Sequence, residues 1–360
     1  MTTTNERTTT KERPPMTTRV LRTPGGGLSL RVTPRAAIVV VVLAVAVFFV
    51  GAVSMTTGDY PLSVGEVIQT LFGFGDRSTE FIVTTLRLPR LLTALLVGGA
   101  LAVSGAILQS LSGNPLGSPD FIGFTEGAAS GALLTIIVVH GGMLQVSFGA
   151  LVGGVATAAL IALLAFKRGV HAFRLILVGI GVNAMLIAFN SYLITRAAHQ
   201  DGLAAQAWLV GGLNGRGWEH VVPVAIAIAV LLPPAFVYGR RLSLLEMGDD
   251  SAKGLGVPVE RSRLVLLGVS VGLCSIATAA AGPIAFLALA APQLAKRLTR
   301  SSGPGLAASA LMGMLLLVTS DLITQQLFAG LPVGLVTGAI GGLYLAWLLV
   351  SRRGVSRAAR

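Results

Sequence analysis

The sequence is divided into long apolar runs, and these runs decide what the chain can fold into. A helix needs about 20 apolar residues to cross a bilayer, and its backbone groups have to pair within the helix. Ten runs come close to this length: 36–55, 88–111, 122–140, 143–166, 174–195, 221–239, 262–281, 283–298, 304–328 and 332–350. The third and eighth are short or interrupted by Gly and Pro. The pattern predicts an all-α polytopic membrane protein with about ten transmembrane helices.

Charge content supports this class. The chain is 53% hydrophobic and 12% charged, whereas soluble domains carry roughly 25% charged residues. The net charge of +12 is typical of cytoplasmic Lys and Arg that orient a membrane protein. We therefore expect no nucleic-acid partner.

The distribution of Lys and Arg predicts the orientation of the chain. An even number of spans places both termini on one side of the membrane. With the N-terminus inside, 22 of the 27 basic residues lie in cytoplasmic segments. The five left outside are Arg77, Arg87, Arg90, Arg196 and Arg216. Because cytoplasmic loops are enriched in positive charge, both termini are predicted to be cytoplasmic.

The chain has three segments of different composition. Residues 1–34 are rich in Thr, Pro, Gly and Arg, which predicts a disordered basic cytoplasmic tail. Residues 35–351 contain all ten apolar runs and form the predicted transmembrane domain. Residues 352–360 are predicted to be a basic C-terminal tail.

The sequence lacks the residues of a self-contained pump. None of its four lysines follows a glycine, so it has no phosphate-binding loop that ends in Gly-Lys. We expect a chain that is not an enzyme and binds no ATP itself. Cys274 is the single cysteine and the four histidines are scattered, so we expect no metal site.

Asp321 is the only clear candidate for an ionisable relay residue inside the bilayer. Such a residue can be a proton or Na⁺ site in an ion-driven carrier. It can also bond neighbouring hydroxyls such as Thr319 or Ser320 and hold helices together. Both alternatives stay open, although the lack of a relay favours a permease that takes its energy from another chain.

The stretch LLEMGDDSAKGLGVPVERSR, residues 244–263, concentrates charge in a chain with only 15 acidic residues. Read as a short helix, it places three acids at the positive end of the helix dipole and Lys253 near the negative end. Gly254 and Gly256 offer cap positions and Pro258 ends the helix, before a second short helix in VERSR. The stretch thus predicts two short helices between membrane helices, but such charge runs are also typical of a solvated loop.

Four motifs occur in an order that is typical of one family. They are RLPRLLTALLVGGALAVSGAILQSLSGNPLGSPDFIGF within 86–132, the charged stretch 244–263, AAAGPIAFLALAAPQLAKRL at 279–298 and LPVGLVTGAIGGLYLAWLL at 331–349. Together they resemble permeases of the FecCD type, from importers of ferric siderophores and vitamin B12. The charged stretch and WLVGGLNGRGW (208–218) are most similar to subunits that carry ferric enterobactin beside a sister permease.

The resemblance implies roles at the two faces of the membrane. The family's short helices after the sixth span dock into a separate cytoplasmic ATPase, which corresponds here to coupling helices within 245–263. The matching residues are Glu246, Gly248, Asp249, Asp250, Lys253 and Gly254. Arg87 and Arg90 stand where the family presents arginines to an extracytoplasmic binding protein, and their i, i+3 spacing puts them on one helix face. A third family arginine corresponds to Gln325.

The resemblance also implies gate and path residues. GNPLG (113–117) matches the turn that closes the path at the inner face, so Asn114 and Leu116 are gate candidates. Asn183 and Asn190 share one face of the fifth run. An amide in a membrane helix is as often an interhelical hydrogen-bond partner as a pore residue, and the family's central fifth span favours the pore.

The implied function is transport of ferric siderophore, of catecholate or enterobactin-like type, across the bacterial plasma (inner) membrane. The implied partners are a second permease in a hetero- or homodimer, two cytoplasmic ATPase subunits, an extracytoplasmic siderophore-binding protein and membrane lipid. ATP and Mg²⁺ would be bound by the ATPase. Import of vitamin B12 or haem by the same mechanism, and an ion-coupled carrier that uses Asp321, are the alternatives.

Overall fold

The computed structural model describes residues 19–22, 29–165, 172–301, 303–328 and 330–357. A principal helix lies in each of the ten apolar runs, which confirms the predicted all-α class. These helices are α1 (Pro34–Thr56), α4 (Leu88–Ser112), α6 (Phe124–Leu134) with its π-helical continuation η2 (Thr135–Val139), α7 (Met143–Ala165), α8 (Ala172–Arg196), α10 (Trp218–Val237), α13 (Val259–Ala281), α14 (Leu287–Thr299), α15 (Leu306–Leu327) and α16 (Val333–Arg357).

The helices differ in their capacity to cross a membrane. Seven described helices are long and apolar enough by length and composition, and Phe124–Val139 and Val333–Trp347 are shorter apolar helices. The eighth run departs most from expectation, because residues 282–286 are not helical. Its helix α14 has 13 residues, or about 20 Å at 1.5 Å per residue, against a hydrocarbon core about 30 Å thick.

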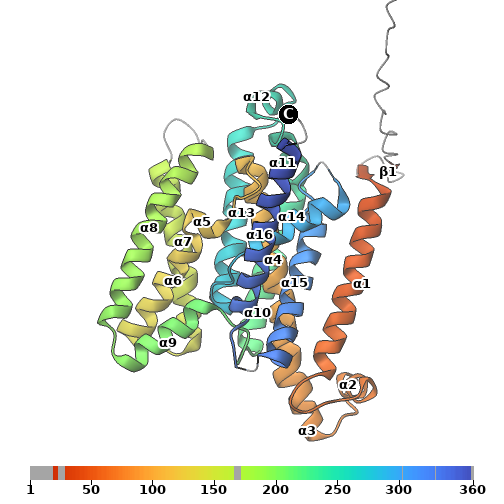
Figure 1. Ribbon diagram of the computed structural model, residues 1–360, viewed down its shortest axis with the longest axis vertical. Coiled ribbons are helices and arrows are strands. Elements are labelled where there is room, and N and C mark those ends of the chain that lie inside the picture. The colour runs from red at the N-terminus through yellow and green to blue at the C-terminus, as the bar shows by residue number, and fades with distance from the viewer. Residues whose placement is uncertain (1–18, 23–28, 166–171, 302, 329, 358–360) are drawn as a thin grey trace, which may run out of the picture.

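Short elements cover the two ends of the bundle (Figure 1). One end, called the α12 end below, carries α11 (Gly239–Leu245) and α12 (Asp249–Gly254). The opposite α9 end carries α2 (Val64–Leu71), α3 (Arg77–Glu80), the π-helix η1 (Phe81–Arg87) and α9 (His199–Val210). Strand β1 (Arg19–Arg22) and the C-terminal part of α16 both lie toward the α12 end (Figure 1).

Both predicted tails contain regular structure in their described residues. In the N-terminal one, β1 pairs antiparallel with β2 (Ser29–Val32), and Arg19 lies opposite Val32. In this pairing the two segments satisfy each other's backbone groups, and the disorder of the tail as a whole stays a prediction. Residues 1–18 and 23–28 of that tail lie outside the described residues. At the other terminus α16 continues through Arg357, so most of the basic tail extends a membrane helix.

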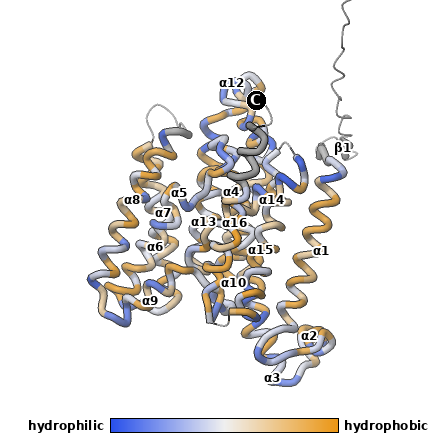
Figure 2. Tube along the Cα trace, in the orientation of Figure 1, coloured by the Kyte–Doolittle hydropathy of each residue, from blue (hydrophilic) through white to orange (hydrophobic). Residues whose placement is uncertain are grey.

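Helix α4 is the centre of the bundle. Every residue from Val97 to Leu111 is buried, and the helix packs against α10, α13, α14 and α15. Close packing depends on small residues: a side chain on Gly98 would meet the carbonyl of Gly313. Ser104 adds an interhelical hydrogen bond to the carbonyl of Ser270, at 2.7 Å. Figure 2 shows the apolar middle of the long helices between more hydrophilic ends.

Candidate functional site

The charged stretch contains one complete short helix, α12, instead of the two that its sequence predicts, and α11 ends at its start. Glu246 is the C-cap of α11 rather than a first-turn acid. Gly248, with φ of 100°, separates α11 from α12, so the helix that begins with Asp249 and Asp250 excludes Glu246. The predicted second helix, VERSR, is the first turn of α13.

The bend after α12 also differs in one residue. Gly256 has the predicted left-handed conformation, with φ of 78°, whereas Gly254 is the last residue of α12. The bend is anchored by Asp249, whose two carboxylate oxygens accept hydrogen bonds of 2.8 and 3.3 Å from Arg263. Ala252 of α12 is fully buried. The segment is therefore held against α13 by an ion pair and by packing.

The outer surface of this segment is mixed in character. Gly248, Asp250, Lys253 and Gly254 are exposed. Met247 and Leu255 beside them are also exposed, at 65% and 60%. An exposed combination of charged and large apolar side chains on a buttressed segment suits docking of another protein.

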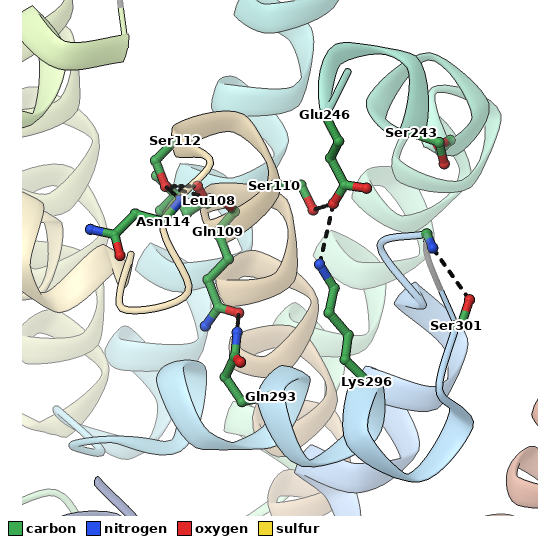
Figure 3. Close-up of polar contacts among 12 residues, drawn as sticks. Leu108, Gln109, Ser110, Ser112, Asn114, Ser243, Glu246, Gln293, Lys296 and Ser301 are labelled. Atoms are coloured by element: carbon green, nitrogen blue, oxygen red, sulfur yellow. Dashed lines mark hydrogen bonds and ion pairs between the residues drawn. The ribbon is translucent and has the colours of Figure 1, made fainter. Parts of the chain in front are cut away.

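Glu246 turns away from that surface and into the bundle. Its Oε1 accepts a 2.6 Å hydrogen bond from Ser110 Oγ of α4 and lies 3.2 Å from Lys296 Nζ of α14. Figure 3 shows the carboxylate of Glu246 between these two groups. Three helices that are far apart in the sequence thus meet at one oxygen atom.

A second polar pair holds the same turn of α4. Gln109 is 3% exposed; it donates to the carbonyl of Leu289 at 3.1 Å and accepts from Gln293 Nε2 at 2.6 Å. We did not predict Gln109, Ser110, Gln293 or Lys296 as site residues. The sequence shows only that these polar residues lie near the ends of the apolar runs of α4 and α14, and it does not indicate which residues they contact.

The predicted gate turn follows directly from this end of α4. Gly113 ends the helix with φ of 61°. Asn114 Oδ1 accepts from the backbone N–H of Leu116 at 2.9 Å, which closes a local turn. Leu116 is 37% exposed. The turn 113–117, called the gate turn below, therefore rests on the α4 residues that contact α11 and α14.

The two asparagines of α8 have different surroundings. Asn190 is buried and bonds Ser130 Oγ at 2.7 Å and Glu126 Oε2 at 3.0 Å, so it is an interhelical hydrogen-bond partner. Asn183 lines a cavity of about 430 Å³, which is also lined by Phe286, just before α14, and by Gly334 of α16. A path role for either residue stays a prediction, and Asn183 has the geometry that suits it.

Two further carboxylates line the same cavity. They are Asp120, in the short helix α5 (Pro119–Ile122), and Glu126 of α6. Asp120 accepts hydrogen bonds from Thr125 Oγ1 at 2.7 Å and Ser118 Oγ at 3.0 Å. The expectation that Asp321 is the one clear ionisable residue within the bundle is therefore wrong. Asp120 lies just before the third run, which predicts a loop position for it, whereas Glu126 lies inside that run.

At the α9 end, the predicted docking arginines have partners inside the chain. Arg90 donates to Asp321 through Nε at 2.9 Å and through a terminal nitrogen at 2.7 Å. Gln325 also donates to Asp321, at 2.8 Å, and Asp321 is 2% exposed. Arg87 donates to the carbonyls of Met55 and Tyr60. Asp321 thus bonds an arginine and an amide rather than the hydroxyls of its neighbours.

A cavity of about 530 Å³ also lies at the α9 end, bordered by Trp208, Asn214 and Arg216 among others. Arg216 is buried and donates to the carbonyl of Gly212 at 3.3 Å. Burial lowers the pKa of Arg216 to about 10, although nearby Glu219 raises it. Arg216, one of the five arginines predicted to lie on the extracytoplasmic side, is therefore buried within the protein. Over the described ranges, we find no group of His, Cys, Asp or Glu that could hold a metal ion.

Comparison with known proteins identifies the family. The FecCD transport family matches residues 35–351. Ferric enterobactin transport system permease protein FepG of Escherichia coli (strain K12) is 46% identical, over 89% of this chain and 97% of that protein. Iron(3+)-hydroxamate import system permease protein FhuG of Bacillus subtilis (strain 168) is 37% identical, over 86% of this chain and 94% of that protein.

A solved structure gives the same result. An inward-facing ABC transporter of metal-chelate type matches with a TM-score of 0.77 and 28% identity, over 88% of this chain and 99% of that chain. The resemblance found in the sequence motifs is confirmed at the level of the whole membrane domain. The chain belongs to the FecCD transport family.

Proposed function

We propose that this chain is the permease subunit of an ATP-binding-cassette importer that carries ferric siderophores of catecholate type across the bacterial plasma membrane. One observation carries the proposal: a FecCD domain spans residues 35–351 and ends, at one face, in a buttressed docking segment, α11–α12. The 46% identity to a ferric enterobactin permease supports the catecholate class. The name of FhuG gives the runner-up cargo, a ferric hydroxamate.

The partners follow from the two ends of the bundle. A separate ATPase, which binds ATP and Mg²⁺, docks on the exposed residues of α12. A siderophore-binding protein docks at the α9 end, and a second permease subunit completes the membrane unit. The excess of Lys and Arg at the predicted inner face supports cytoplasmic termini, which assigns the α12 end to the cytoplasm.

Transport in this scheme is a rigid-body switch. Closure of the ATPases pushes α11–α12, and the membrane helices alternate between outward and inward access. The gate turn, with Asn114 and Leu116, opens or closes the inner side of the path. The chain itself catalyses no covalent step.

An ion-coupled carrier is less well supported. Its proton or Na⁺ site would be Asp321, whose two oxygens already accept hydrogen bonds from Arg90 and Gln325. A guanidinium in two-point contact with a carboxylate forms a strong and geometrically specific ion pair. Such a group is a structural ion pair rather than an exchanging cation site.

The test is uptake by proteoliposomes that contain this chain, its sister permease, the ATPase and the binding protein. We expect ATP-dependent uptake of an iron-55 catecholate siderophore in preference to an iron-55 hydroxamate or vitamin B12. Preference for the hydroxamate would refute the catecholate class, and equal uptake without the ATPase would refute the ATP-driven mechanism. Asp250→Lys should abolish uptake because it puts a positive charge on the exposed face of α12, whereas Lys253→Arg, which keeps its charge, should retain it.

A further inference from the structure

The contacts of Glu246 give it a place different from that of its neighbours in the docking segment. Its side chain is 20% exposed, and that of Lys296 is 27% exposed. Asp250, four residues later, is exposed. The carboxylate of Glu246 is therefore directed toward α4 and α14 and away from the surface that an ATPase would contact.

The Ser110–Glu246 bond joins two parts of the molecule that are otherwise connected by packing. Within the part of the chain that the structure describes, it is the polar side-chain link between α11 and α4. The link between α4 and α14 has its own bonds, through Gln109, Leu289 and Gln293. Removing the Glu246 carboxylate would therefore leave only packing between the docking segment and α4, while the hydrogen bonds between α4 and α14 remain.

The position of Ser110 makes this link relevant to the gate. Ser110 is buried, and its carbonyl accepts a hydrogen bond from the N–H of Gly113, the first residue of the gate turn. A displacement of α11 that pulls on Ser110 consequently acts three residues from Gly113. Lys296 lies beside the same carboxylate oxygen and compensates its charge in a partly buried place, where an unpaired charge is unfavourable.

We propose that Glu246 is a positioning residue that transmits movement of α11–α12 to the last turn of α4, and so to the gate turn, with Ser110 as its contact and Lys296 as its counter-ion. This inference rests on the proposed function. It assigns Glu246 to the interior of the coupling machinery instead of the ATPase interface. Loss of the link should therefore uncouple transport from ATP hydrolysis without preventing the ATPase from docking.

The experiment uses the complete importer in proteoliposomes and measures siderophore imported per ATP hydrolysed. Ser110→Ala and Glu246→Leu, which each remove one partner of the Ser110–Glu246 hydrogen bond, should lower this ratio about tenfold, since a hydrogen bond to a charged group is worth at least that factor in a conformational equilibrium. Lys296→Met leaves that bond in place and removes the counter-ion, so it should lower the ratio by a smaller factor. ATP hydrolysis itself should persist. The double variant Glu246→Lys/Lys296→Glu restores the ion pair and a donor to Ser110 Oγ, and should recover most of the ratio.

Ser243→Ala is the matched control. Its hydroxyl lies on α11 and bonds the carbonyl of Gly239 in the same helix, so its loss leaves the link to α4 intact and the ratio unchanged. If the single variants keep the wild-type ratio, or lose transport and hydrolysis in equal proportion, the inference is wrong. Failure of the double variant to recover would overturn the part assigned to Lys296.

The wild-type complex separates this inference from the proposed function. If it imports no ferric siderophore when supplied with ATP, the proposed function fails. If it imports siderophore and the variants keep the wild-type ratio of siderophore imported to ATP hydrolysed, only the role proposed for Glu246 fails. Because Ser110→Ala removes a single oxygen atom, it also keeps the test valid if the charged substitutions prevent insertion.

Discussion

The two ends of helix α4 differ in what their polar residues hold. At the α9 end, Arg90 forms a two-point contact with the buried Asp321 of α15, and Arg87 bonds the carbonyls of Met55 and Tyr60. At the α12 end, Ser110 reaches the partly exposed Glu246 on a surface segment. One end is held to its own bundle by an ion pair, and the other is joined to the exposed α11–α12 segment, on which we propose that an ATPase docks.

The physical reason for this difference is burial. Separating Arg90 from Asp321 would leave a carboxylate that is 3% exposed without its counter-charge, which is strongly unfavourable. Glu246 and Lys296 can each reach solvent in part, so their separation is less unfavourable. A transporter in which this difference holds would move its inner gate while it keeps the α9 end of α4 in place.

The largest expected effect comes from breaking the ion pair between Arg90 and Asp321. Arg90→Met should lower the stability of the folded protein by about 3–5 kcal/mol, because it strands a buried carboxylate. Thermal unfolding in detergent or nanodiscs measures the change. The double variant Arg90→Met/Asp321→Leu should recover much of the loss, since two apolar side chains can replace a buried pair.

Arg77→Met is the control for that series, because Arg77 is exposed at the same end of the molecule. It should unfold like the wild type. A normal melting temperature for Arg90→Met, together with weakened binding of the siderophore-binding protein, would show that Arg90 serves docking. It would also show that the Arg90–Asp321 pair does not stabilise the α9 end.

An intermediate effect is expected at the α12 end. Gln109→Leu leaves the amide of Gln293 and the carbonyl of Leu289 without their partner, which should destabilise by about 1–3 kcal/mol. Replacing both partners in Gln109→Leu/Gln293→Leu should be closer to neutral. The same unfolding measurement applies. A loss larger than that of Arg90→Met would reverse the order of rigidity between the two ends.

The smallest effect belongs to the docking segment itself. The Asp249 side chain is 41% exposed and that of its partner Arg263 is 8% exposed. Solvent therefore reaches the pair from the Asp249 side, and Asn at position 249 keeps an oxygen that can accept from Arg263. Asp249→Asn should destabilise by at most about 1 kcal/mol, and Asp250→Asn, at an exposed neighbouring position, by less. Thermal unfolding again gives the comparison. A decrease as large as that of Arg90→Met would mean that the segment belongs to the rigid part of the bundle.

Helix positions could be predicted well because the requirement behind them is local. A run of apolar residues has to pair its own backbone groups in lipid, whatever its neighbours are. The eighth run is an instructive exception: the predicted span includes the non-helical residues 282–286. Phe286 there has φ of 63°, a conformation that hydropathy does not encode.

The site could be predicted only in part. Asp249 and Asp250 do begin a short helix, as their charges indicate. Glu246 does not, because Gly248 adopts a positive φ and assigns it to the preceding helix. Asp120 lies just before the third apolar run, which predicts a loop position for it. Glu126 lies inside that run, but hydropathy gives no information on which side chains face a cavity between helices.

The sequence by itself determined the class of the protein, the positions of its membrane helices, the excess of basic residues on one side and the family. Each of these depends on short windows or on the order of motifs. The tertiary structure decided which charges are free and which are held. Arg90 and Asp321 are 231 positions apart, and Ser110 and Glu246 are 136 apart. Such pairs form only when helices pack side by side. A charged or polar group buried between helices is energetically unfavourable unless it is paired or hydrogen-bonded, and the packing decides which partner is within reach.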